Sequence, residues 1–306
     1  MKLLTAFLVL VLLLFVLDAS RVEARGTPAG HQKKWSNKSL FVFGDDFTDN
    51  GNLPLTDPVT EFSRQWAYPY GSSYVDAHGF PRPNTPSGRF SNYKIQSDFI
   101  GKCIFINGPI FSNSIALVAI SGNDYASPGV TGRSSINDIN AYIGKVTMEI
   151  SANVDRLQKL GVKKVLVNNL HPVGCTPSKT QTNNYTECDI FGNYGASVHN
   201  NNMKQVMATK KNVHIIDLYA AFTNIVNNAQ GSELSKQFKR KLSPCCESLD
   251  SKGYCGQQSA SSELLYNVCD KSNKFFYWDG MNPTHAGWEA VMKQLQKPLK
   301  DFIDQN

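Results

Sequence analysis

Residues 138–170, "DINAYIGKVTMEISANVDRLQKLGVKKVLVNNL", contain the pattern of a helix followed directly by that of a strand. In the first part, apolar side chains recur every three or four residues, which is the spacing of one helix face. They are Ile139, Ile143, Val146, Ile150, Val154, Leu157 and Leu160. Asp138 is suited to a position near the N-cap and Gly161 to the C′ position after the last turn. The apolar run in 163–170 then predicts a buried strand.

The same two patterns alternate along the rest of the chain. Apolar runs predict buried strands at 39–43, 114–120 and 213–219, with a shorter candidate at 103–107. Helical spacing occurs at 92–100, at 190–209, in a short stretch through Ile225 and after Trp278. Almost wholly apolar strands that alternate with helices are typical of a parallel sheet with helices on both faces. We therefore predict an α/β protein.

The N-terminus has the features of a secretory signal peptide. Lys2 precedes an apolar run from Leu3 to Leu17, and small residues surround a cleavage position after Ala24. The run is shorter than the roughly 20 residues that a membrane-spanning helix needs. We therefore predict a signal peptide at 1–24, a secreted product and no stable membrane insertion. An uncleaved anchor is the alternative. With no repeat or shift in composition beyond this point, 25–306 is predicted to form a single domain.

The cysteines indicate an oxidising compartment. All seven lie after residue 24, namely Cys103, Cys175, Cys188, Cys245, Cys246, Cys255 and Cys269. A metal site is the competing interpretation, but no CxxC pair is present and histidine is scarce near these positions. Disulfides are favoured, with Cys103 left over. The spacing leaves the connectivity open.

Charge and short motifs exclude some functions and indicate one modification. The formal net charge is +6, and the 31 basic residues are scattered rather than clustered, which argues against nucleic-acid binding. No motif for a cofactor or metal is present. Asn37 and Asn184 each begin an Asn-x-Ser/Thr sequence in a polar stretch, so we expect N-glycosylation at both.

Polar residues follow the predicted strands at three places. Asp45 and Asp46 follow the first strand, Asn123 and Asp124 follow the strand at 114–120, and a polar loop runs from Asp279 to His285. In open α/β sheets, ligands bind beyond the carboxyl ends of the strands. These residues are therefore expected to form one site.

Five motifs in a fixed order give the chain a family resemblance. They are "FVFGDDFTDNGN" (41–52), "PSGRFSN" (86–92), "SGNDY" (121–125), "NNLHPVGCTP" (168–177) and "WDGMNPTHAGW" (278–288). The chain resembles the plant-type GDSL (SGNH) esterase/lipases over most of its length. The resemblance implies a three-layer α/β/α sandwich of the SGNH-hydrolase, flavodoxin-like type with a five-stranded parallel sheet. It also implies ester hydrolysis by a Ser-His-Asp triad, with glycine and asparagine as oxyanion donors.

Two triad positions depart from the family pattern. The nucleophile position holds Asp46 and the base position holds Asn282, whereas Asp279 matches the triad acid and Asn123 the oxyanion asparagine. An aspartate with a reference pKa of about 3.9 is ionised near neutrality and attacks weakly. An asparagine amide cannot take up the proton that the triad base accepts.

The middle of the chain is shorter than the resemblance implies. Only 14 residues separate Ile100 from Ile115, where family members place another strand and helix. We predict that one strand–helix segment is missing. The run 103–107 with Gly108 is a candidate replacement for that strand and its oxyanion glycine.

The sequence leaves three hypotheses about function. In the first, the chain is a secreted family member, inactive or severely impaired, because losing a triad nucleophile or base lowers turnover on the order of 10⁶-fold. Its cleft would still bind an acyl ester or another small molecule. In the second, it hydrolyses lipid or other esters with Asp46, Asn123 and His285. For this case Asn282 is predicted as a helix N-cap, with His285 three residues on. In the third, an unpaired edge on the first strand makes the chain fold poorly. No sequence feature indicates an oligomeric state.

Overall fold

The computed structural model describes residues 39–56, 58–76, 78–82, 85–105, 114–126, 135–227 and 233–305. All of them belong to one compact unit, Ser36–Asn306. The predicted signal peptide, Asn37 and Gly108 lie outside the described residues, as does the side chain of Cys103.

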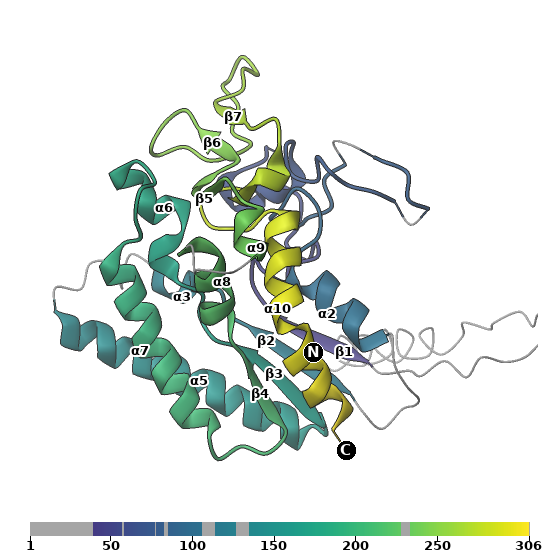
Figure 1. Ribbon diagram of the computed structural model, residues 1–306, viewed down its shortest axis with the longest axis vertical. Helices are drawn as coiled ribbons and strands as arrows, with labels where there is room; N and C mark the ends of the chain where they lie inside the picture. The colour runs from purple at the N-terminus through teal and green to yellow at the C-terminus, as the bar shows by residue number, and fades with distance from the viewer. Residues whose placement is uncertain are drawn as a thin grey trace, which may run out of the picture. The chain divides into compact units, whose positions relative to one another are not determined.

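A four-stranded parallel sheet forms the centre of this unit (Figure 1). Its strands are β1 (Leu40–Gly44), β2 (Ile115–Ala119), β3 (Lys164–Asn168) and β4 (Val213–Ile216), in the order β1-β2-β3-β4. The register places Val42 of β1 beside Leu117 of β2, which in turn lies beside Leu166 of β3. Within the described residues the sheet thus has one strand fewer than the five that the family resemblance implies.

Helices cover both faces of the sheet. The helices α5 (Ile136–Lys159) and α7 (Ile190–Met207) cover one face, where Val118 and Val167 pack against Ile150 and Met203. The other face is covered by α2 (Gln96–Phe105), α8 (Leu218–Val226) and α10 (His285–Asp304). Because successive strand residues point to opposite faces, Leu117 and Leu166 belong to this second core. The predicted three-layer α/β/α sandwich is confirmed (Figure 1).

Short elements and three disulfides complete the unit. The short helices are η1 (Glu61–Trp66), α3 (Asn123–Ala126), η2 (Val173–Cys175), α6 (Pro177–Thr180), η3 (Gln181–Asn183), α9 (Glu233–Lys236) and η4 (Ser272–Lys274). Two further strand pairs are β5 (Arg240–Pro244) with β8 (Phe275–Tyr277), and β6 (Cys246–Ser248) with β7 (Tyr266–Val268). The disulfides join Cys175 to Cys188, Cys245 to Cys269 and Cys246 to Cys255, as the preference for disulfides over a metal site predicts. In the part of the chain described, none of the helices has the length and apolar character needed to cross a membrane.

Two predictions about helices need correction. The strand candidate at 103–107 is wrong for residues 103–105, which form the last turn of α2, because the helical apolar spacing from Ile95 continues into them. Asp138 lies near the N-cap of α5, as predicted, because the N-cap is Ser135, whose hydroxyl accepts the Asp138 backbone N–H. The terminal helix begins at His285 with Thr284 as its N-cap, and not at Asn282. The Thr284 hydroxyl accepts the Gly287 backbone N–H, whereas Asn282 Oδ1 accepts no hydrogen bond among the described residues and the Asn282 amide donates to Asp279.

Strand β1 forms where the apolar run predicts a strand, but it is not buried. It is an edge strand among the described residues, and Phe41 and Phe43 are 48% and 47% exposed. Both point to the face that carries α5 and α7, where their neighbours on β2 are Ala116 and Val118. The prediction of a buried strand is wrong, because burial would require a further strand and helix on the outer side.

Candidate active site

Asp45 joins the carboxyl ends of β1 and β2. Both of its carboxylate oxygens accept the Ser121 backbone N–H, at 3.0 and 2.9 Å. The two strand ends approach so closely at Gly44 that an added Cβ would lie 2.4 Å from the Ala119 carbonyl oxygen. Glycine is therefore required at this position. This junction brings the loop with Asp46 next to the loop with Asn123.

The environment of Asp45 favours its neutral form. Burial, with a smaller contribution from the neighbouring Asp46, raises the pKa of Asp45 to about 7 against the opposing effect of the Ser121 N–H. Since both oxygens are occupied by Ser121, the role of Asp45 is to hold the two loops together.

Asp46 lies in the predicted nucleophile position with the predicted oxyanion donor beside it. The Asn123 Nδ2 donates to Asp46 Oδ1 at 3.3 Å. Both residues line a cavity of about 750 Å³. Burial raises the pKa of Asp46, and Asp279 and Asp49 add to the increase, while Arg64 opposes it. The Asn123 amide, which is expected to stabilise an oxyanion, is therefore already hydrogen-bonded to the Asp46 carboxylate.

Asn282, at the predicted base position, is hydrogen-bonded to Asp279, the predicted triad acid. Its Nδ2 lies 3.1 Å from each oxygen of Asp279, and its backbone N–H donates to Asp279 Oδ1 at 2.7 Å. Both residues are buried. The amide donates to the acid as an imidazole N–H would, but it has no basic nitrogen with which to remove a proton.

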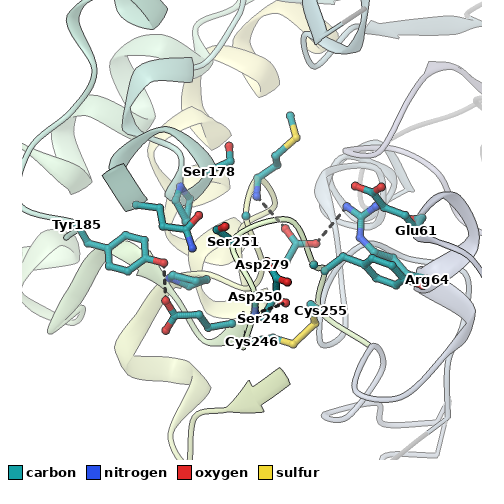
Figure 2. A pocket seen from close by; sticks show the side chains of 18 residues that line it. Glu61, Arg64, Ser178, Tyr185, Cys246, Ser248, Asp250, Ser251, Cys255 and Asp279 are labelled. Atoms are coloured by element: carbon teal, nitrogen blue, oxygen red, sulfur yellow. Dashed lines mark hydrogen bonds and ion pairs between the residues drawn. A yellow bond between two sulfur atoms is a disulfide. The ribbon is translucent and has the colours of Figure 1, made fainter. Parts of the chain in front are cut away.

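Two residues that the sequence analysis missed complete the surroundings of Asp279. Tyr70 Oη donates to Asp279 Oδ2 at 2.7 Å. Arg64 Nη2 lies 3.6 Å from the same oxygen (Figure 2). Arg64 Nε also donates to Tyr70 Oη at 3.0 Å, and its guanidinium lies 4.9 Å from the centre of the Phe90 ring. The only sequence signal was a single arginine in an aromatic stretch, "EFSRQWAYPY" (61–70).

His285 is placed away from this cavity. Its ring stacks on Phe99 with centroids 5.6 Å apart and lies 5.0 Å from the Tyr93 ring, and its backbone N–H donates to Asn92. Burial lowers the pKa of His285. No histidine is among the described residues that line the 750 Å³ cavity.

Two other histidines are buried in the packing of the fold. His171 lies between Phe47 and Phe222, with centroid distances of 5.0 and 5.3 Å. Tyr125 Oη lies 2.6 Å from His199 Nδ1. Burial lowers the pKa of His171 to about 3 and that of His199 to about 4, so both are neutral near pH 7.

The remaining site predictions concern metals and glycans. The described residues contain no group of three or more His, Cys, Asp or Glu side chains arranged to hold a metal ion. Asn184 is exposed and has a left-handed backbone conformation at the end of η3, which leaves its side chain accessible to modification.

Comparisons with known proteins identify the same family that the five sequence motifs resemble. The model of the "GDSL-like Lipase/Acylhydrolase" family matches residues 40–295. Similar proteins from Arabidopsis thaliana include "GDSL esterase/lipase At5g03610", 29% identical over 323 aligned positions that cover 85% of this chain and 86% of the relative. For "GDSL esterase/lipase At3g09930" the identity is 26%, with 88% and 90% covered. For "GDSL esterase/lipase At5g03600" it is 28%, with 86% and 95% covered.

The first alignment is longer than the part of this chain that it covers. Since 85% of 306 residues is about 260, about 60 of the 323 aligned positions have no counterpart here. Gaps of this total length accommodate one strand–helix segment. The family model spans well over half of the chain and all four strands of the sheet. The chain therefore belongs to the family of GDSL-like lipases and acylhydrolases.

Proposed function

We propose that this chain is a secreted member of the GDSL esterase/lipase family in which ester hydrolysis is lost or severely impaired. The observation that carries the proposal is the hydrogen-bonding of Asn282, whose amide donates to both oxygens of the triad acid. Asn282 thus takes the place of the base without providing a proton acceptor. The neighbouring cavity remains large enough to hold a small molecule.

The nucleophile position supports the same conclusion. A serine attacks because a base removes its proton as the bond forms. Asp46 has no such proton to give up when it is ionised, and it places negative charge where an oxyanion would develop. Removal of a triad nucleophile or base lowers turnover on the order of 10⁶-fold, and the two losses overlap rather than multiply.

The alternative, an active hydrolase that uses Asp46, Asn123 and His285, has less support. A general base must lie within hydrogen-bonding distance of the proton that it removes, directly or through one water. The His285 ring instead stacks on Phe99 and lies outside the cavity lining.

Secretion and glycosylation form part of the proposal. Three disulfides suit an oxidising compartment such as the secretory pathway. The signal-peptide pattern at 1–24 points the same way. Asn184 is exposed and accessible to the glycosylation machinery, and Asn37 carries the same sequence motif.

An ester-hydrolysis assay on a short-chain nitrophenyl ester tests the catalytic part. The secreted chain is expected to give only the background rate. The double variant Asp46→Ser/Asn282→His is expected to exceed that rate, because Asp279 and Asn123 are already in place to hold the base and the oxyanion. It should still fall short of a complete site, since one missing oxyanion donor costs roughly 10²–10³-fold. Steady turnover by the unaltered chain, equal to or above that of the double variant, would contradict the proposal.

A further inference from the structure

The cavity beside Asp46 has more negative than positive charge. Its described lining includes four carboxyl groups and one guanidinium, namely those of Asp45, Asp46, Asp49, Glu61 and Arg64. Arg64 is already paired with Asp279, which lies next to the cavity. When Asp46 is ionised, it and Asp279 therefore share one positive charge, and one negative charge remains uncompensated.

Asp46 is the carboxylate in this wall that is best able to bind a ligand. Asp45 is occupied by the Ser121 N–H, and Asp49 Oδ1 accepts the backbone N–H groups of Gly51 and Asn52 at 2.8 and 2.7 Å. By contrast, the Asp46 carboxylate accepts one long hydrogen bond within the described residues, from Asn123, and its interaction with Arg64 is electrostatic. Glu61 is exposed and adds a second carboxylate to the lining.

The rest of the wall is suited to an apolar body. Phe62, Leu53, Phe90 and Met281 contribute to it, and Phe62 and Leu53 are 78% and 42% exposed. Aromatic faces attract organic cations as well as apolar groups. The volume of about 750 Å³ lies within the range of small-molecule sites, about 300–1,000 Å³.

The same features argue against other ligand classes. The described residues hold no cluster that could bind a metal ion, so a cation here is expected to be organic. A carboxylate ligand would meet the like charge of Asp46. A serine in this position would carry no charge, so the substitution that removes the nucleophile also supplies a counter-ion.

We propose that this cavity binds a small organic cation with an apolar body, an amine or a quaternary ammonium compound, with Asp46 as its counter-ion. The inference rests on the proposed function, because a working triad would need position 46 for catalysis. It names the ligand class of that same site.

The test compares three probes of the same shape and different charge. They are choline, the neutral 3,3-dimethylbutan-1-ol and the anionic 3,3-dimethylbutanoate, titrated calorimetrically at constant ionic strength and pH 8. Choline is expected to bind at least about tenfold more tightly than the alcohol, and the anion more weakly than both. In Asp46→Asn, which keeps the side-chain shape but leaves Glu61 in the lining, the preference for choline over the alcohol should fall clearly below that of the unaltered chain.

A matched control makes the same chemical change elsewhere. Asp301 is exposed on α10 and pairs with Lys297, so Asp301→Asn should leave the choline preference unchanged. A thermal unfolding transition confirms that each variant is folded. Equal binding of choline and the alcohol by the unaltered chain, or an undiminished preference in folded Asp46→Asn, would overturn the inference.

The probes contain no ester bond, so this result is independent of catalysis. Nitrophenyl-ester turnover by the unaltered chain would contradict the proposed loss of activity but would not affect a measured preference for choline. Conversely, if the chain shows neither ester turnover nor a preference for choline, the proposed ligand class is wrong and the proposed loss of activity stands.

Discussion

His171 provides a quantitative prediction about stability. It is fully buried between Phe47 and Phe222, and neither ring nitrogen has a hydrogen-bond partner among the described residues. An unsatisfied buried polar group costs about 1–3 kcal/mol. His171→Phe removes both nitrogens and extends the aromatic cluster. At pH 7 the variant is therefore expected to be more stable than the unaltered chain by about 1–3 kcal/mol, less any cost of the larger ring.

The advantage of His171→Phe should grow in acid. Burial lowers the folded-state pKa of His171 to about 3, from an ordinary value of 6.5. Between these values the unfolded chain binds a proton at His171 and the folded chain does not. The contribution of His171 to stability is therefore lost as pH falls below 6.5. Between pH 7 and pH 5 the loss is about 1.9 kcal/mol at 1.36 kcal/mol per pKa unit.

Thermal or urea unfolding of both proteins at pH 7 and pH 5 measures this effect. The difference in unfolding free energy between His171→Phe and the unaltered chain should increase by about 2 kcal/mol on going to pH 5. At about 2–4 °C per kcal/mol, the difference in melting temperature should increase by about 4–8 °C. His78→Phe, which makes the same exchange at an exposed position in a turn, is the matched control. A difference that stays constant with pH would refute the reasoning that His171 is neutral and unpaired.

Three further predictions concern other parts of the fold. The pKa of Asp45, about 7 in the folded chain against 3.8 ordinarily, implies that its stability contribution is present in acid and lost as pH rises through 7. From pH 6 to 8 the unaltered chain should thus lose about 1.4 kcal/mol relative to Asp45→Asn in unfolding titrations, and equal slopes would contradict this. Phe41→Lys on the edge strand β1 should reduce self-association in light scattering, whereas Ile190→Lys, at an 80% exposed position on α7, should have less effect. Asn184→Gln should remove one glycan from the protein made in a secreting host, read by mass spectrometry, and an unchanged glycan mass would show that Asn184 is not modified.

Local sequence patterns predicted the central part of the fold. The strands β2 and β3 and the helices α5 and α7 combine strong apolar periodicity with neighbours that bury them, so pattern and structure agree. Strand β1 shows where the pattern is insufficient. Its residues are as apolar as those of β2, but burial depends on what lies beside the strand, and the described residues place nothing on its outer edge.

The candidate site shows the same division between local and long-range information. Motifs at strand ends identified four site residues, namely Asp46, Asn123, Asp279 and Asn282. In the structure, Asp46 and Asn123 line one cavity and are hydrogen-bonded to each other, and Asn282 is hydrogen-bonded to Asp279 beside that cavity. The contact between Tyr70 and Asp279 was not predictable, because it spans 209 residues and starts from a stretch without periodicity. The start of α10 was misjudged because both Asn282 and Thr284 are good N-caps, and only the structure shows that the Thr284 hydroxyl accepts the first-turn N–H of Gly287.

The central claim is that the nucleophile and base positions no longer support ester hydrolysis. The most direct measurement is kcat/KM for a short-chain nitrophenyl ester with the unaltered chain and with Asp46→Ala, both purified identically and confirmed as folded. We predict that the two values are equal and indistinguishable from the rate without protein. Turnover by the unaltered chain that is well above this background, and that Asp46→Ala abolishes, would contradict the account.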